Sequence, residues 1–167
     1  MAKRPQAVVL MGVSGCGKTS VGVQLSRHLD WPFYDGDDFH PLQNITKMGQ
    51  GIPLDDADRV PWLANLHDLI SEHISSGQSI LLACSALKGK YRDQLTKNNP
   101  GTVFVYLKGD FNLIFERMRV RPGHYMKADM LQSQFSALEE PTDALVVDIS
   151  QDIDWITKEI VSWLDLK

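Results

Sequence analysis

The chain has little cysteine, no excess of positive charge and no long hydrophobic run. Its two cysteines, Cys16 and Cys84, are too few for a disulfide scaffold and lack the paired spacing of a zinc site. The net charge of −4 gives no electrostatic support to nucleic-acid binding. The apolar run AVVLM after the basic start MAKRPQ is too short for a signal peptide or a membrane span. We therefore expect a cytoplasmic protein with neither nucleic acid nor membrane as a partner.

The length of 167 residues suits a single α/β domain that spans residues 1–167. Short apolar runs typical of buried strands alternate with amphipathic stretches typical of helices. The predicted strands are 7–11, 32–35, 79–84, 103–107 and 144–148. The predicted helices begin at Thr19, Asp58, Asp110 and Asp152, with the three aspartates as N-terminal caps. This alternation predicts a parallel sheet with helices on both faces and ligands outside the carboxyl ends of the strands.

The sequence GVSGCGKT comes directly after the first predicted strand. Its glycines let backbone N–H groups curl around phosphate oxygens, and the next helix adds partial positive charge at its N-terminus. Lys18 can reach the β- and γ-phosphates, and the Thr19 hydroxyl can ligate Mg²⁺. A lowered thiol pKa at Cys16 is conceivable, but a small side chain that fits the loop is the favoured interpretation. The predicted nucleotide-binding residues of the loop are Gly12, Val13, Ser14, Gly15, Cys16, Gly17, Lys18 and Thr19.

A phosphate loop alone does not define the fate of the bound nucleotide. The guanine-reading pattern N-K-x-D and the switch pattern D-x-x-G of GTPases are both missing from the sequence. A small-molecule kinase needs an acceptor pocket opposite the loop and a lid that carries arginines. The chain has candidates for both, and a module that uses ATP only as a conformational switch is the alternative.

The acceptor side begins with DGDDFHP at 35–41, after the second predicted strand. On an extended segment, Asp35 and Asp37 share a face. One can hold a Mg²⁺-bound water while the other accepts the proton of a substrate hydroxyl. Asp38 is interpreted as the cap of the next helix, and His40 is a further candidate in the same motif.

Three cations are candidates for binding an acidic acceptor. Arg59 offers a planar fork for a carboxylate or phosphate, although a first-turn ion pair with one of the neighbouring aspartates is an equally good interpretation. Lys88 and Arg92 are four residues apart and are predicted to share a helix face near the end of the third strand.

The lid candidate is ERMRVRPGHYMKADM at 116–130. Arg117 and Arg121 are spaced to lie on one face where the helix ends, whereas Arg119 is interpreted as a surface residue. A mobile segment over the nucleotide, at about 119–130, would exclude water and neutralise charge on the transferred group. His124 lies in this segment and is another candidate.

Together the motifs resemble the gluconate kinases of the P-loop small-molecule kinase group. The resemblance rests on GVSGCGKT, DGDDFHP, NITKMGQGIPLDDADRVPWL, CSALKGKYRDQL, VYLKGDF, RPGHYM and LQSQFSALEEP, and spans residues 8 to about 148. It implies an α/β P-loop NTPase fold with a five-stranded parallel sheet and a lid, as in nucleoside-monophosphate kinases. The implied reaction is phosphorylation of D-gluconate at its 6-hydroxyl by ATP and Mg²⁺, giving 6-phospho-D-gluconate and ADP. Members are often homodimers, so a homodimer is possible here.

The resemblance also implies roles for individual residues. The implied catalytic residues are Lys18, Asp37 and Arg121, and the residues on ATP are 12–19 with Arg117 and Arg121. The implied substrate-binding residues are Asp37, His40, Arg59, Lys88, Arg92 and His124, and the metal ligands are Thr19 and Asp35. Shikimate, another sugar acid or a nucleoside monophosphate stay open as alternative acceptors.

Overall fold

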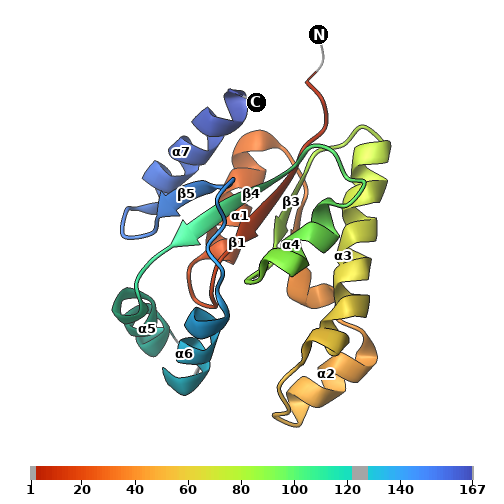
Figure 1. Cartoon of the computed structure of the whole chain (residues 1–167). Coiled ribbons are helices and arrows are strands. Elements are labelled where there is room, and N and C mark those ends of the chain that lie inside the picture. Colours follow the sequence, from red (N-terminus) through yellow and green to blue (C-terminus); the bar gives the residue numbers. More distant parts are fainter. Residues whose placement is uncertain (1–2, 122–127, 167) are drawn as a thin grey trace.

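The computed structural model describes residues 3–121 and 128–166. Within these residues, the centre of the fold is a five-stranded sheet in the order β2-β3-β1-β4-β5 (Figure 1). All neighbouring strands are parallel. The strands are β1 (Ala7–Met11), β2 (Phe33–Asp35), β3 (Ile80–Ala83), β4 (Thr102–Lys108) and β5 (Leu145–Asp148). The predicted strands and the parallel sheet are confirmed.

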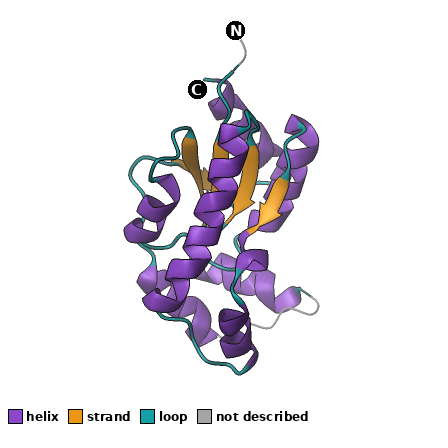
Figure 2. Cartoon of the chain, turned by 90° about the vertical axis from the view of Figure 1, so that its right-hand side faces the viewer, coloured by secondary structure: helices purple, strands orange, loops and turns teal. Residues whose placement is uncertain are grey.

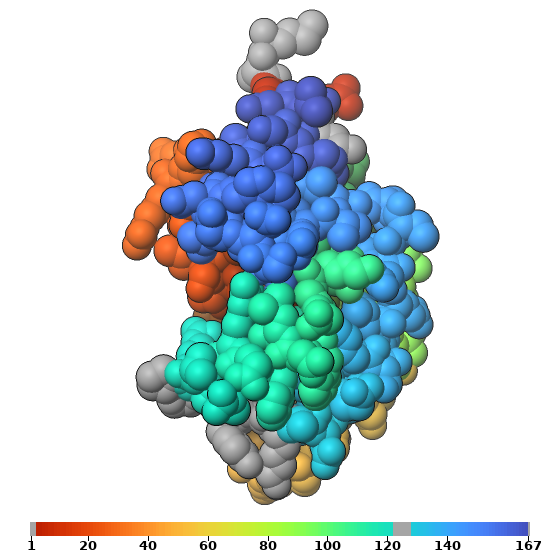
Figure 3. Space-filling model, turned by 90° about the vertical axis from the view of Figure 1, so that its left-hand side faces the viewer, coloured from red at the N-terminus to blue at the C-terminus, as the bar shows by residue number. Residues whose placement is uncertain are grey.

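Helices cover both faces of this sheet (Figure 2). They are α1 (Lys18–Leu29), the 3₁₀ helix η1 (Gly36–Phe39), α2 (Leu42–Gly49), α3 (Asp56–Ser75), α4 (Gly89–Thr96), α5 (Phe111–Val120), α6 (Ala128–Ala137) and α7 (Ile153–Asp165). Helices α1 and α7 pack together on one face, and α3 packs against α4 on the other (Figure 1). Helices α5 and α6 lie side by side near the carboxyl ends of the strands (Figures 1 and 3).

The sheet separates two hydrophobic cores. Successive strand residues point to opposite faces, so Val8 and Leu10 belong to one core while Val9 and Met11 belong to the other. The first core lies under α1, α5, α6 and α7, and the second lies under α3 and α4. Both faces of β1 are therefore buried, which explains its unbroken apolar sequence.

The predicted helix caps are partly correct. Asp110 and Asp152 cap α5 and α7, where their carboxylates accept hydrogen bonds from backbone N–H groups. The prediction that Asp58 caps α3 is wrong, because Asp55 is the cap. The carboxylates of Asp55 and Asp58 each accept the other's N–H, at 2.8 and 3.0 Å, and this capping box uses both acids. Asp38 caps no helix either, since it lies within η1 and α2 starts after Pro41.

Asp58 also fastens α2 to α3, and this contact predicts a dependence of stability on pH. Both of its carboxylate oxygens accept hydrogen bonds from Lys47 Nζ, at 2.8 and 2.9 Å. Lys47, and after it the N–H of Asp55, lower the pKa of Asp58. The folded state thus favours the ionised form, so this stabilisation is present above the ordinary aspartate pKa and is lost as the pH falls through the lowered value.

We expect the free energy of unfolding to fall between about pH 5 and pH 3, and to fall less in Asp58→Asn. Urea titrations across this range measure the difference. Asp68→Asn, which removes an exposed carboxylate from the same helix, is the matched control and should behave as the unaltered protein. If the free energy of unfolding fell equally with pH in Asp58→Asn and Asp68→Asn, the assignment of this pH dependence to Asp58 would be wrong.

Candidate active site

A cleft of about 910 Å³ opens at the carboxyl ends of the strands. It gathers the phosphate loop, the turn after β2, the end of β3, the end of α5 and the loop after β5. Its lining residues are Ser14–Val21, Asp35, Asp37, Ala83–Ser85, Arg117, Met118, Arg121, Ile149, Gln151–Ile153 and Ile156. Residues predicted from three separate motifs, the phosphate loop, the acid motif and the lid candidate, therefore lie around one space.

The phosphate loop has the backbone that its glycines predict. Gly12, Gly15 and Gly17 have φ angles of 146°, 81° and 101°, and a Cβ on Gly12 would lie only 2.9 Å from the Leu107 carbonyl oxygen. Lys18 Nζ donates to the carbonyl oxygens of Gly12 and Val13, at 2.9 and 3.1 Å. The loop thus holds its own cation over the position where phosphates bind in such loops.

Cys16 is a packing residue of this loop. Burial raises the pKa of its thiol, against the opposing effect of Lys18. A Cβ on Gly12 would approach Cys16 Sγ to 2.7 Å, so the sulfur fills the space that the glycine leaves. The conceivable lowered pKa is wrong, and the interpretation of Cys16 as a small side chain that fits is confirmed.

Asp35 and Asp37 reach the cleft in a different way from the prediction. They do not alternate along an extended strand, because Asp35 Oδ1 accepts the N–H of Asp37, at 3.0 Å, and turns the chain into η1. Trp62 Nε1 donates to the Gly36 carbonyl at 2.8 Å and fixes this turn. The walls of the cleft remove part of the water around Asp37, which raises the pKa of its carboxyl, and the negative charge of Asp35 raises it further.

The donors in the cleft fit a magnesium ion bound together with phosphates. The described residues contain no cluster of three or more histidine, cysteine or acidic side chains that could hold a metal on their own. The cleft does offer the Thr19 hydroxyl and the Asp35 carboxylate beside the phosphate loop. Mg²⁺ usually takes one or two protein oxygens and completes its shell with water and phosphate oxygens, so this small set is sufficient.

His40 lies behind Asp37, with only 6% of its side chain exposed. Its ring stacks on Trp62, with centroids 4.4 Å apart. Burial, and secondarily the charge of Arg59, lower the pKa of His40 against the effect of Asp37. Asn44 Nδ2 donates to Nδ1 at 3.2 Å, so the proton of the neutral ring is assigned to Nε2, which lies 4.0 Å from Asp37 Oδ1.

A basic cluster, formed by Arg59, Lys88 and Lys90, surrounds Asp56 and Tyr91. Arg59 and Lys88 approach Asp56 Oδ1 to 3.9 and 3.5 Å, and Lys90 and the Tyr91 hydroxyl donate hydrogen bonds to the same carboxylate. Lys90, followed by Tyr91, lowers the pKa of Asp56 well below its usual range. The ion-pair interpretation of Arg59 is confirmed for Asp56, while its binding of an acceptor remains a prediction.

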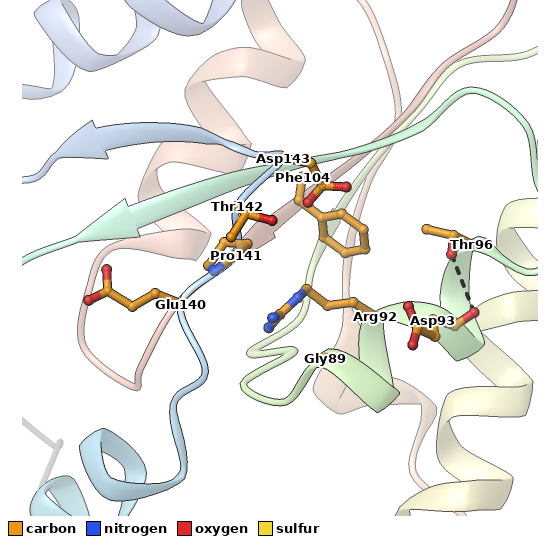
Figure 4. A pocket seen from close by; sticks show the side chains of 9 residues that line it. All are labelled: Gly89, Arg92, Asp93, Thr96, Phe104, Glu140, Pro141, Thr142 and Asp143. Atoms are coloured by element: carbon orange, nitrogen blue, oxygen red, sulfur yellow. Dashed lines mark hydrogen bonds between the residues drawn. The ribbon is translucent and has the colours of Figure 1, made fainter.

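Arg92 does not share a face with Lys88. Lys88 is the extended cap residue before α4, whereas Arg92 lies within the helix and is only 9% exposed. Its guanidinium donates to the carbonyl oxygens of Ala86 and Glu139, at 2.7 and 2.9 Å. Figure 4 shows Arg92 in a separate hollow of about 330 Å³, with its guanidinium directed toward the chain at Glu140. The predicted common face is wrong because the helix starts one residue after Lys88.

The lid candidate is described at residues 116–121 and at 128–130, where α6 begins. Arg117 and Arg121 both line the cleft from the end of α5. Arg119 pairs with Glu116 at 2.8 Å, which confirms it as a surface residue. Residues 122–127, and with them His124, lie outside the described residues.

One wall of the cleft was not predicted from the sequence. This wall consists of residues that come after β5 or lie in α7, namely Ile149, Gln151–Ile153 and Ile156. The rule that ligands bind at the carboxyl ends of parallel strands could have found them. Gln134 was not predicted either, because its contacts with the phosphate loop have no local signal in the sequence.

Comparisons with known proteins identify the family. Residues 14–165 match the shikimate kinase family model. The thermoresistant gluconokinase of Escherichia coli K12 is 46% identical over 157 residues, which cover 92% of this chain and 90% of that protein. The chain belongs to the gluconokinase family. The family assignment makes the protein an enzyme, a kinase, as the sequence predicted.

Two solved structures agree with the gluconokinase family assignment. A gluconokinase from Sinorhizobium meliloti 1021 has a TM-score of 0.84 at 42% identity, covering 96% of this chain and 92% of that one. A sugar kinase from Janibacter sp. HTCC2649 has a TM-score of 0.88 at 40% identity, with coverages of 96% and 95%. The P-loop kinase fold is thereby confirmed. Among the described residues, no helix combines the length and apolarity that crossing a membrane requires.

Proposed function

We propose that the protein transfers the γ-phosphoryl group of ATP to the 6-hydroxyl of D-gluconate, giving 6-phospho-D-gluconate and ADP. The observation that supports this most is the single cleft shared by Lys18, Asp37 and Arg121. A lysine that can bind phosphates and a carboxylate that can receive a proton in one cleft support phosphoryl transfer. The gluconokinases of high identity over most of the chain support gluconate as the acceptor.

In the proposed mechanism, Asp37 orients the 6-hydroxyl and accepts its proton. The hydroxyl oxygen forms a bond to the γ-phosphorus while the bond to the β–γ bridging oxygen breaks, and the electron pair leaves on ADP. The raised pKa makes the Asp37 carboxylate a stronger base once it is ionised. The ring of His40 lies beside this carboxylate, with Nε2 at 4.0 Å from Asp37 Oδ1.

Cations of the cleft stabilise the charge that spreads over the transferred group. Lys18 lies over the phosphate loop, and Arg117 and Arg121 line the cleft from α5. Such preorganised charges act most strongly where water is excluded. Thr19 and Asp35 are the residues that would hold Mg²⁺, which when bound neutralises phosphate charge.

The acceptor carboxylate is assigned to the basic cluster. Arg59 and Lys88 already converge on the carboxylate of Asp56, so the cluster is built to bind that chemical group. Arg92 also holds the backbone of the loop that carries Lys88, and its binding of the acceptor remains a prediction. His124 remains a predicted substrate-binding residue.

Removal of the Arg59 side chain should weaken the binding of gluconate but not that of ATP. In Arg59→Ala we expect KM for gluconate to rise about 10- to 100-fold, the worth of a charge-assisted hydrogen bond, while KM for ATP changes less than about two-fold. Steady-state kinetics with each substrate varied measure this. Lys97→Ala is the control, since Lys97 is an exposed lysine at the end of α4 that lies outside the basic cluster. Equal effects of both variants on KM for gluconate would contradict the assignment.

An acceptor panel tests the proposed function itself. ADP release is measured with ATP, Mg²⁺ and, in turn, gluconate, another sugar acid, shikimate and a nucleoside monophosphate. We expect strong stimulation by gluconate, and its absence would overturn the choice of acceptor. ATP binding with no acceptor-stimulated ADP release would instead support the nucleotide-switch alternative.

Three further expectations belong to this proposal. They are a single domain over 1–167 with a lid at about 119–130, a cytoplasmic location and a possible homodimer. Light scattering at several protein concentrations tests the oligomeric state.

A further inference from the structure

Gln134, in α6, reaches across the fold to the phosphate loop. Its side-chain Oε1 accepts the backbone N–H of Ser14 at 2.7 Å, and its Nε2 donates to Ser14 Oγ at 2.9 Å. The two bonds fix the orientation of the amide, because only the oxygen can accept and only the nitrogen can donate. One side chain therefore holds both the peptide and the hydroxyl of a loop residue that is 120 positions away.

The neighbouring loop residue is held from the adjacent helix. A Cβ on Gly15 would lie 2.5 Å from Met118 Cγ and 3.3 Å from Ile114 Cγ2, so α5 packs directly against the glycine backbone. Since α5 and α6 contact each other, Ser14 and Gly15 rest on one helix pair. The Ser14 N–H is used by Gln134, while the first turn of α1 leaves its N–H groups free of intrahelical partners. This arrangement aims the later part of the loop at phosphate.

The chain beyond Gln134 reaches the acceptor side within five residues. Glu139 Oε1 accepts the N–H of Gly89 at 2.8 Å, and Glu139 N–H donates to the Leu87 carbonyl oxygen at 2.8 Å. Leu87 and Gly89 flank Lys88 of the basic cluster. The segment 134–139 thus contacts the phosphate loop at one end and the Lys88 loop at the other.

We propose that Gln134 is a positioning residue of phosphoryl transfer. It fixes the Ser14 peptide of the phosphate loop and, through the segment 134–139, holds that loop in register with the Lys88 loop. The site for the γ-phosphate and the site for the acceptor are then aligned before either ligand binds. In-line transfer requires this alignment. The inference rests on the proposed kinase reaction for its kinetic test, but not on the identity of the acceptor for its binding test.

The first test compares Gln134→Ala with Gln132→Ala, an exposed glutamine on the same helix. We expect Gln134→Ala to lower kcat about ten-fold and to weaken ATP binding several-fold, while KM for the acceptor changes less than two-fold. Calorimetric titration with a non-hydrolysable ATP analogue gives the binding arm without any acceptor. If gluconate were the wrong acceptor, this arm would still report on Gln134.

The second test separates positioning from general stability. Ser14→Ala combined with Gln134→Ala should cost no more in kcat than Gln134→Ala alone, because both remove one interaction. Additive losses, or a Gln134→Ala enzyme with the kcat and ATP affinity of Gln132→Ala, would overturn the proposal even if its melting temperature fell.

Discussion

Replacement of Lys18 by alanine is expected to lower kcat by about 10²- to 10⁴-fold. The loop carbonyls of Gly12 and Val13 already hold the ammonium in place, so no ordering step precedes its contact with the phosphates. The loss should fall on kcat more than on acceptor KM, because the negative charge that Lys18 stabilises grows in the transition state. Steady-state assays of ADP release at saturating ATP and acceptor measure the change in kcat.

Arg27→Ala provides the control for the Lys18 variant. It removes a cation from the exposed last turn of the same helix, far along α1 from the loop. It should retain activity within about two-fold, as surface substitutions do when no special contact is lost. If Lys18→Ala had the same kcat as Arg27→Ala, Lys18 would have no role in stabilising the transition state.

Asp37→Asn is expected to abolish measurable turnover while ATP binding stays nearly intact. Asparagine keeps the size of the side chain but cannot accept the hydroxyl proton, and general-base catalysis typically contributes about 10²- to 10⁴-fold. Rapid-quench measurement of phosphoryl transfer and calorimetric titration with an ATP analogue separate the two effects. Asp38→Asn alters the next carboxylate of η1 and is the matched control, with activity expected near that of the unaltered protein. Wild-type turnover in Asp37→Asn would show that another group accepts the proton.

Much of this fold could be predicted because its signals are local. Strands β1 and β3 are continuous apolar runs, and Asp110 and Asp152 stand directly before amphipathic stretches. The phosphate loop can be recognised from glycine spacing alone. Asp35 and Asp37 could be predicted from their place at the end of β2, although the chain there turns into η1 because Asp35 accepts the N–H of Asp37.

The remaining features depend on contacts between distant parts of the chain. Spacing placed Lys88 and Arg92 on one helix face, but the guanidinium of Arg92 is drawn to carbonyl oxygens of Ala86 and Glu139. In the string LDDAD, several acids can cap α3, and Lys47 in another helix engages Asp58. The role of Gln134 could not be predicted from the sequence, because its partner Ser14 is 120 residues away.

The division of the interior by the sheet has a consequence for how such an enzyme changes over evolution. Val13 and Cys16 of the phosphate loop rest on one core, whereas Trp62, Ala86 and Tyr91 beside the basic cluster rest on the other. Substitutions in the second core alter the packing beside the basic cluster, whereas Val13 and Cys16 pack in the first core. A lineage can therefore exchange one phosphate acceptor for another while it inherits the ATP site unchanged.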